Sequence, residues 1–439
     1  MKIGVLPVIV FFVLSVFLMA VSCSKSDDGA ASRDGKTAVT ITYFTSQGSM
    51  HEYNNKMARR LKENENIEVE FQVVPDDQYY TLAKTKLATN EVPDIIEYNT
   101  PSNNIELNVQ ENCIPLDNEE WFPRLVNPEL LRDPRDGKVY AMPLTSSSTF
   151  LAWYFNKTKL EEMEISTGQP RSYADFLARC EEIKQKGNGE VAPIVMAAAD
   201  SWTVQIYPVV GEMMVMYPNE REICAKLERN ELQWNRIPEF LKVMEDMAAL
   251  KDLGYLNKDF LSTTFDMSKE KVARGEAIMA LQTESFPQDI AAKFPDIEMG
   301  SWICNYQDKM ILPIGAYVRG LFVPKKGKHP DEARRFLNLW SQPEYQNIHF
   351  QDLPGLPPFK DGDGGEMLDC VRRLVDTYVP ANQYSVNMND ILSTPSPIYP
   401  QVWLMYVDML SGGLTPRELM DQWQGVYEDY MKELGMPGF

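Results

Sequence analysis

Histidines and acidic loops are the parts of this chain that could hold a metal ion, but neither is arranged to do so. The three histidines, His51, His329 and His349, are far apart and form no recognisable ligand cluster. The stretch 361–366 (DGDGGE) begins like a calcium loop, but its sixth residue is not glycine. Arg372 occupies its twelfth position, where a bidentate glutamate belongs. We therefore expect no metal site and interpret this stretch as a solvated turn.

Nucleophilic and phosphate-binding motifs are also incomplete. The run 35–37 (GKT) resembles the end of a phosphate-binding loop, but Ala30 stands where the first glycine is needed and no strand precedes it. No Gly-x-Ser-x-Gly elbow occurs. We expect no catalytic residue and no cofactor. Besides Cys23, five cysteines without Cys-x-x-Cys spacing are interpreted as small buried apolar side chains: Cys113, Cys180, Cys224, Cys304 and Cys370.

Carboxylates are the most abundant groups that could act chemically. The chain has 63 Asp and Glu against 43 Lys and Arg, and its formal net charge is −20. This charge argues against nucleic acid as a partner, because phosphate contacts need a positive face. The number of carboxylates does not exclude a catalytic pair among them, so a secreted glycoside hydrolase is an alternative function.

The first 23 residues predict where the protein works. Lys2 is followed by an apolar run over 3–21, and the chain turns polar directly after Cys23. This pattern is typical of a secretory signal peptide over 1–22. Cys23 resembles the lipidated cysteine of a bacterial lipobox, although Ala20 stands where that motif usually has leucine. The alternative is an uncleaved membrane anchor. Both interpretations predict an extracytoplasmic body, held at the membrane by a flexible tether over 23–37.

The mature chain of 417 residues, after removal of 22 from 439, is long enough for two lobes. Its first part alternates between strands rich in β-branched residues and helical segments. We predict strands over 38–44, 67–74 and 92–98, with helices over 51–64 and 77–90. Strand–helix–strand alternation indicates a parallel sheet with crossover helices.

Ligands of such sheets bind beyond the carboxyl ends of the strands, which directs attention to the loops 45–48 and 99–102. The alternation continues later in the chain. The further predicted elements are helices over 159–186, 238–253, 330–341 and 415–434, and strands over 190–199, 276–281 and 319–324.

Short motifs in a fixed order resemble the extracellular solute-binding proteins of bacterial ABC importers, in particular the large family of sugar and oligosaccharide binders. Phe155 replaces the usual tyrosine of one motif and Ala141 the usual glycine of another. The matching segments are 88–95 (ATNEVPDI), 136–143 (DGKVYAMP), 153–157 (WYFNK), 171–176 (RSYADF), 272–279 (VARGEAIM), 323–327 (VPKKG) and 333–337 (ARRFL).

The resemblance implies an α/β periplasmic-binding-protein fold with two lobes. Each lobe would be a mostly parallel sheet flanked by helices, and two or three chain crossings would form the hinge. We expect the N-terminal lobe over 38–145 and 318–352, and the C-terminal lobe over 146–317 and 353–439. The resemblance also implies a monomer that captures a sugar by lobe closure, delivers it to an ABC permease and catalyses nothing. A surface adhesin or assembly lipoprotein is a third possibility.

Resemblance and loop position together predict the ligand contacts. Aromatic rings stack on the apolar faces of sugars, and polar groups bond the hydroxyls. Tyr98, Phe286 and Trp403 could instead be core residues, Arg319 could pair with a structural carboxylate, and 145–149 could be an ordinary hinge. The predicted contacts are Ser46, Gln47, Tyr98, Asn99, Ser147, Ser148, Thr149, Trp202, Glu284, Phe286, Tyr317, Arg319 and Trp403.

Overall fold

The computed structural model describes residues 39–439 except 90, 102, 127, 134, 146–148, 316–317 and 387–398. The predicted signal peptide, Cys23 and the tether lie outside the described residues. In the part of the chain that is described, no helix has the length and apolar character needed to cross a membrane.

A five-stranded sheet in the order β2-β1-β3-β11-β4 organises the lobe that contains the first strands of the chain. The strands β1 (Val39–Ser46), β2 (Ile67–Val74) and β3 (Ile95–Thr100) run parallel, which confirms the predicted strand–helix–strand segment. In contrast, β11 (Val318–Phe322) pairs antiparallel with both β3 and β4 (Ala141–Pro143). The sheet is therefore mixed, because a strand from late in the chain returns to it.

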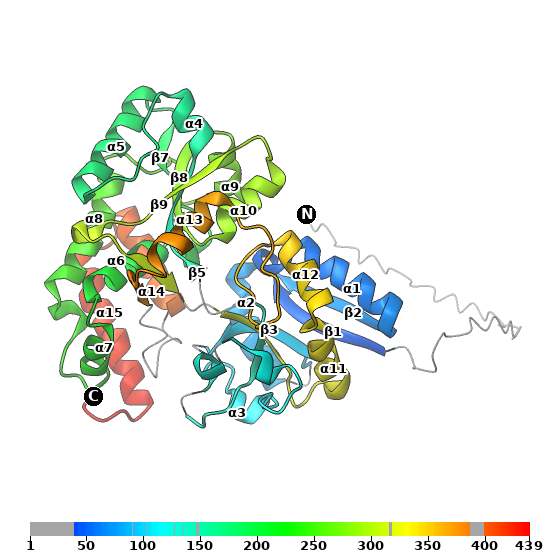
Figure 1. Cartoon of the computed structure of the whole chain (residues 1–439). Coiled ribbons are helices and arrows are strands. Elements are labelled where there is room, and N and C mark those ends of the chain that lie inside the picture. Colours follow the sequence, from blue (N-terminus) through cyan, green and yellow to red (C-terminus); the bar gives the residue numbers. More distant parts are fainter. Residues whose placement is uncertain are drawn as a thin grey trace, which may run out of the picture. The chain divides into compact units, whose positions relative to one another are not determined.

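Helices cover both faces of this sheet. Alternate side chains of β1 point to opposite faces, so Tyr43 joins the core under α1, α11 and α12, and Phe44 joins the core under α2. The helices α1 and α12 lie side by side (Figure 1), joined by an ion pair between Lys56 and Asp352. The helices are α1 (Glu52–Glu65), α2 (Asp76–Ala88), α3 (Val109–Asn112), α11 (Pro330–Trp340) and α12 (Pro343–Asp352).

Two further sheets follow. A four-stranded sheet has the order β7-β8-β6-β9, in which only β7 and β8 are parallel, and a three-stranded sheet has the order β12-β10-β5. The strands are β5 (Thr149–Phe150), β6 (Ala152–Asn156), β7 (Ala192–Ile194), β8 (Ala277–Gln282), β9 (Met299–Trp302), β10 (Leu312–Gly315) and β12 (Tyr384–Val386).

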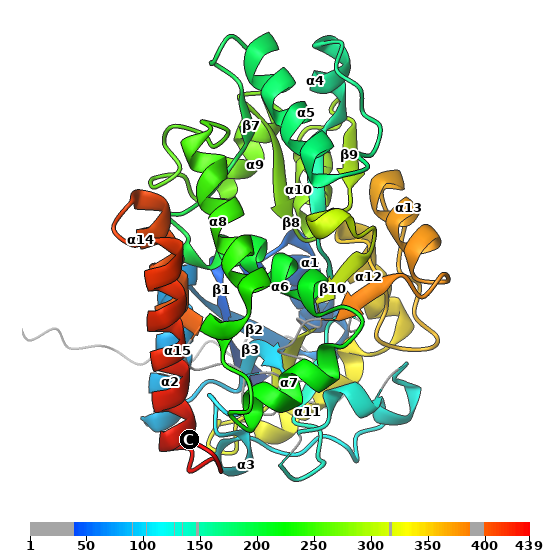
Figure 2. The same ribbon diagram turned by 90° about the vertical axis from the view of Figure 1, so that its left-hand side faces the viewer.

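Alternation along β6 again divides the side chains between two cores. Trp153 and Phe155 pack in the core with α5, α6 and α8, and Tyr154 packs in the core with α9, α10 and α13. Figure 2 shows α14 and α15 running past α8, against which both pack. The helices are α4 (Lys157–Glu162), α5 (Tyr173–Lys186), α6 (Ile206–Met216), α7 (Glu220–Glu228), α8 (Pro238–Asp252), α9 (Phe265–Ala273), α10 (Ser285–Lys293), α13 (Asp369–Tyr378), α14 (Tyr399–Ser411) and α15 (Pro416–Glu433).

The chain passes between the five-stranded sheet and the rest after β4, before β11 and after α12, in agreement with a two-lobed α/β fold. The third passage comes later than the predicted boundary at residue 353. Phe359 is buried in the core of the five-stranded sheet beside Trp121, and Asp361 pairs with Arg124 at 3.0 Å. These contacts hold the segment around residues 359–361, expected in the C-terminal lobe, against the first sheet.

All five cysteines within the described residues are free and buried, which confirms their interpretation as small apolar side chains. Burial raises the pKa of Cys113 to about 12 and of Cys370 to about 11. Their thiols therefore stay protonated and unreactive at neutral pH.

Asn156 connects the start of α4 to the end of α9, and its contribution to stability can be tested. Its Oδ1 accepts the Lys159 N–H at 2.8 Å as the N-cap of α4, and its Nδ2 donates to the Val272 carbonyl at 2.8 Å. We expect Asn156→Ala to lower the free energy of unfolding by about 3 kcal/mol, because it removes a cap and the buried hydrogen bonds that Nδ2 donates to the Val272 and Ala273 carbonyls. Urea denaturation measures the change.

Ser172→Ala is the matched control, since Ser172 caps α5 through one bond to the Asp175 N–H and has no other side-chain bond among the described contacts. It should cost about 1 kcal/mol. Equal losses in the two variants would contradict a contribution from the carbonyl contacts of Asn156.

Candidate ligand-binding site

A cavity of about 300 Å³ lies between the five-stranded sheet and the second half of the chain. It adjoins the carboxyl ends of β1 and β3, where the predicted parallel topology places a ligand. From the lobe of the five-stranded sheet it is lined by Ser46, Gly48, Ser49, His51, Tyr53, Asp76, Tyr79, Tyr80, Glu97, Asn99, Asn103, Glu106, Leu144, Thr145, Arg319, His349 and Leu353. From the other lobe it is lined by Thr149, Leu151, Trp202, Gln205, Ile206, Val209, Phe265, Thr283, Glu284, Ser285 and Trp403.

Seven of the residues predicted to contact ligand line this cavity: Ser46, Asn99, Thr149, Trp202, Glu284, Arg319 and Trp403. Gln47 is exposed on the short 3-10 helix Gln47–Ser49 and is not part of the lining. Ser147, Ser148 and Tyr317 lie outside the described residues. The remaining two, Tyr98 and Phe286, lie elsewhere.

Tyr98 and Phe286 are core residues with no exposed surface. Tyr98 follows Glu97 in β3, and successive side chains of a strand point to opposite faces, so Glu97 and Asn99 line the cavity while Tyr98 packs under α2. Phe286 packs against Phe265 with ring centroids 6.0 Å apart. The aromatic surface expected from these two residues comes from other rings instead.

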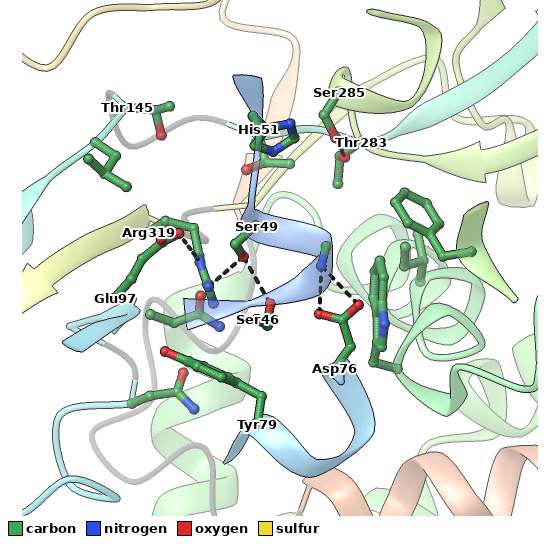
Figure 3. A pocket seen from close by; sticks show the side chains of 18 of the residues that line it. Ser46, Ser49, His51, Asp76, Tyr79, Glu97, Thr145, Thr283, Ser285 and Arg319 are labelled. Carbon is green, nitrogen blue, oxygen red and sulfur yellow. Dashed lines mark hydrogen bonds and ion pairs between the residues drawn. The ribbon is translucent and has the colours of Figure 1, made fainter. Parts of the chain in front are cut away.

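An ion pair between Glu97 and Arg319 forms one wall of the cavity (Figure 3). Arg319 Nε donates to Glu97 Oε1 at 3.1 Å, and its Nη2 donates to Ser49 Oγ at 2.5 Å. Tyr43 Oη and Thr45 Oγ1 both donate to Glu97 Oε2 at 2.8 Å. Burial works against the charge of Arg319, but Glu97 opposes this and raises the pKa of the guanidinium overall. Arg319 therefore remains charged and held in place.

Aromatic rings approach the cavity from both sides. On the side of the first sheet, Tyr79 and Tyr80 of α2 lie 5.6 Å apart, and Tyr80 meets Trp403 edge to face at 5.8 Å. On the other side, Trp202 meets Phe265 edge to face at 5.0 Å. Flat apolar rings flanking polar groups are suited to bind a ligand that has both apolar faces and hydroxyl edges.

A stack of rings that the sequence analysis did not predict closes another part of the cavity. Tyr53 lies between His349, at 4.2 Å and nearly parallel, and His51, at 5.5 Å. Burial and the nearby His51 lower the pKa of His349 to about 3, so its ring is neutral. The fold brings two of the three histidines together, yet no group of three metal-binding side chains occurs among the described residues.

The profile of the bacterial extracellular solute-binding proteins matches residues 47–347. The chain belongs to this family. One relative of this solute-binding protein is the multiple sugar-binding protein of Streptococcus mutans, which is 26% identical over 367 residues, covering 81% of this chain and 82% of the relative.

Solved structures share the two-lobed fold of this solute-binding protein. A sugar transporter protein from Bacillus licheniformis in complex with stachyose has a TM-score of 0.72 at 21% identity, covering 90% of this chain and all of that one. The binding protein RafE in complex with raffinose has a TM-score of 0.72 at 20% identity, with the same coverage. A chitin oligosaccharide binding protein has a TM-score of 0.73 at 16% identity, covering 90% of this chain and 99% of that one.

Glu284 is a largely buried carboxyl group at the cavity of this solute-binding protein. It sits at the start of α10, and its Oε2 accepts the Phe150 N–H at 2.9 Å. Burial raises the pKa of Glu284 to about 7, and the hydrogen bond from Phe150 opposes this only in part. At neutral pH the carboxyl group therefore exists in both its protonated and its ionised form.

This shift predicts a pH dependence of stability. Between the ordinary glutamate pKa and about 7, folded Glu284 keeps a proton that the unfolded chain has released. The free energy of unfolding should therefore fall as the pH rises from about 4.5 to about 7, by about 3 kcal/mol for this group. Glu284→Gln should lose this contribution and become more stable relative to the wild type at pH 7.5 than at pH 5.

Chemical denaturation at the two pH values measures the difference. Comparison between variants is needed because burial also raises the pKa of Glu212, to about 8, and adds to the slope of both proteins. Glu190→Gln, at an exposed position, is the control and should keep the wild-type slope. An unchanged slope in Glu284→Gln would show that Glu284 titrates normally.

Proposed function

We propose that this solute-binding protein captures a sugar or oligosaccharide outside the cytoplasm by closure of its two lobes and delivers it to an ABC permease. The observation that carries the proposal is the cavity, in which aromatic rings and polar side chains from both halves of the chain surround one space. The relatives named for sugar binding, and the similar structures that hold raffinose and stachyose, support the same ligand class.

The composition of the lining suits a saccharide. A pyranose ring has apolar C–H faces that Trp202 and Tyr80 can cover, and each square ångström of apolar surface removed from water contributes about 25 cal/mol. Its hydroxyl groups need partners, because a buried unpaired hydroxyl costs about 1–3 kcal/mol. Asn99, Glu284 and Arg319 can supply acceptors and donors around the ring edge.

Closure of the two lobes is favoured by a ligand that contacts both of them. A ligand that touches both lobes binds the closed state more tightly than the open one and shifts the equilibrium toward it. Within the predicted crossing 145–149, Ser147, Ser148 and Thr149 would then meet the ligand where the lobes join, with Tyr317 at the second crossing. These contacts, together with Ser46, Gln47 and Trp403, form the proposed site.

The same proposal includes an anchor. A signal peptide over 1–22 would be removed, Cys23 would carry the lipid, and the tether that follows would leave the body free to reach the permease as a monomer. Release of the ligand chemically unchanged completes this function, because a binding protein breaks no bond in its cargo.

Ligand capture can be tested by thermal shift with neutral mono- and oligosaccharides, including raffinose and stachyose. At a ligand concentration 100 times Kd, binding adds about 2.7 kcal/mol of stability. Trp202→Ala should abolish this shift, because it removes an aromatic surface from the cavity. Unfolding without ligand measures separately the loss of the Trp202–Phe265 contact.

Trp202→Phe is the matched control and should keep most of the ligand-induced shift, since it retains an aromatic ring. Full ligand stabilisation in Trp202→Ala would remove Trp202 from the site. The binding function itself is contradicted if no saccharide stabilises the wild type in a saturable way. New reducing ends after incubation with oligosaccharides would instead indicate a hydrolase.

The anchor can be tested in cells. Cys23→Ser should move the protein from the membrane fraction to the soluble or secreted fraction, or leave it unprocessed, because serine does not accept the lipid. Ser24→Ala, the neighbouring control, should stay with the membrane. Mass spectrometry of the mature N-terminus identifies the modification, and an unmodified Cys23 in the wild type would refute the lipoprotein assignment.

A further inference from the structure

The charged groups that line the cavity are mostly carboxyls. Within the described residues the lining contains Asp76, Glu97, Glu106 and Glu284 against a single guanidinium, that of Arg319. The lining contains no lysine in this part of the chain. His349 adds no charge, because burial holds its pKa at about 3.

The one guanidinium is already neutralised. Arg319 pairs with Glu97 at 3.1 Å, and Glu97 is almost completely buried beneath it. This pair contributes no net charge to the cavity. Lys84 lies 4.0 Å from Glu106, which also accepts the Tyr98 hydroxyl at 2.8 Å, so Glu106 is largely compensated.

Two carboxyls remain without a cation. Asp76 accepts the Gly48 N–H at 3.1 Å, and Glu284 accepts the Phe150 N–H at 2.9 Å. No ion pair joins either group to a lysine or arginine within the described part of the chain. Lys269 lies over the ring of Phe265, which lines the cavity, but its charge is already paired with Asp266 and Asp289.

Several buried polar atoms of side chains that line the cavity have no hydrogen-bond partner among the described residues. Tyr79 and His349 are each 1% exposed, yet the Tyr79 hydroxyl and both ring nitrogens of His349 have no hydrogen-bond partner among the described residues. The buried Trp403 Nε1 also has none. All three side chains line the cavity, so a ligand with hydroxyl or amino groups would satisfy them.

We propose that the cavity selects saccharides by charge: it rejects those that carry a carboxylate or phosphate and prefers those that carry a protonated amine, with Glu284 and Asp76 as the counter-charges. This inference rests on the proposed sugar-binding function. An anionic sugar would face two uncompensated carboxyls in a partly desolvated space, whereas an ammonium group would meet an opposite charge there.

Raffinose provides a matched series of probes. The C6 of its galactose unit carries a hydroxyl in raffinose, and it can be converted to an ammonium-bearing or a carboxylate-bearing carbon without other change. Isothermal titration of the wild type should show one-to-one binding in which the amine is bound about tenfold more tightly than raffinose, and the carboxylate about tenfold more weakly. The preference should shrink at high salt.

Proton release gives a second readout. An ammonium group beside Glu284 favours its ionised form, and since the pKa of Glu284 is about 7, binding of the amine near neutral pH should expel a fraction of a proton. The Tyr154 hydroxyl, which also interacts with Glu284, stays protonated because burial raises its pKa. Titration in buffers of different ionisation enthalpy measures the released protons, and raffinose itself should release none.

Glu284→Gln should reduce the preference for the amine at least about threefold and abolish the proton release, whereas the exposed Glu190→Gln should change neither. This control separates the cavity from attraction to the net charge of −20. Amine binding no tighter than raffinose, or an equal preference in Glu284→Gln, would overturn the charge selection. If raffinose or another neutral saccharide still binds, the proposed function survives that result.

Discussion

The buried ion pair between Glu97 and Arg319 is the contact on which the cavity depends. Glu97 lies in the middle of β3 and Arg319 in β11, a strand that enters the sheet from far along the chain and runs antiparallel to β3. A buried charge must be paired and hydrogen-bonded, so the carboxylate draws Tyr43, Thr45 and Arg319 together. The strands β1, β3 and β11 are thereby joined around one point in the cavity wall.

This arrangement explains why the sheet is mixed. Its parallel part, β2-β1-β3, is connected by local crossovers through α1 and α2. The strand β11 joins it only after the chain has passed through the strands of the other lobe, β5 to β10. The chain leaves the three-stranded sheet at Gly315, the end of β10, and enters the five-stranded sheet at Val318, the start of β11, so Arg319 lies close to a crossing. Arg319 is thus a residue of the five-stranded sheet that lies near a crossing and also lines the cavity.

The chemistry of the cavity follows from which groups are compensated. The charge of Glu97 is balanced by its ion pair with Arg319. Glu106 lies near Lys84 and accepts a hydrogen bond from the Tyr98 hydroxyl. Glu284 has one backbone donor and no cation, so burial raises its pKa to about 7. Aromatic rings on both sides lower the local dielectric, which strengthens whatever charge remains. A polar ligand therefore meets a cavity that is flat and apolar on its walls and acidic at its edges.

The sequence by itself determined the order of elements and the family. The period-two pattern of residues 67–74 and the cap Thr415 before α15 lie where the structure has them, because strand alternation and capping depend on neighbouring residues. Motif order likewise indicated a two-lobed solute-binding protein before any contact was known. Local signals were sufficient for these features.

Only the tertiary structure decided which side chains reach the cavity. Glu97 and Asn99 line it while Tyr98 between them is core, a choice that depends on which face of β3 is covered by α2. Tyr79, Tyr80 and His349 had no distinguishing local pattern, and they reach the cavity because α2 and α12 pack on opposite faces of one sheet. No periodic pattern in the sequence indicates contacts between residues hundreds of positions apart, so these contacts became visible only in the tertiary structure.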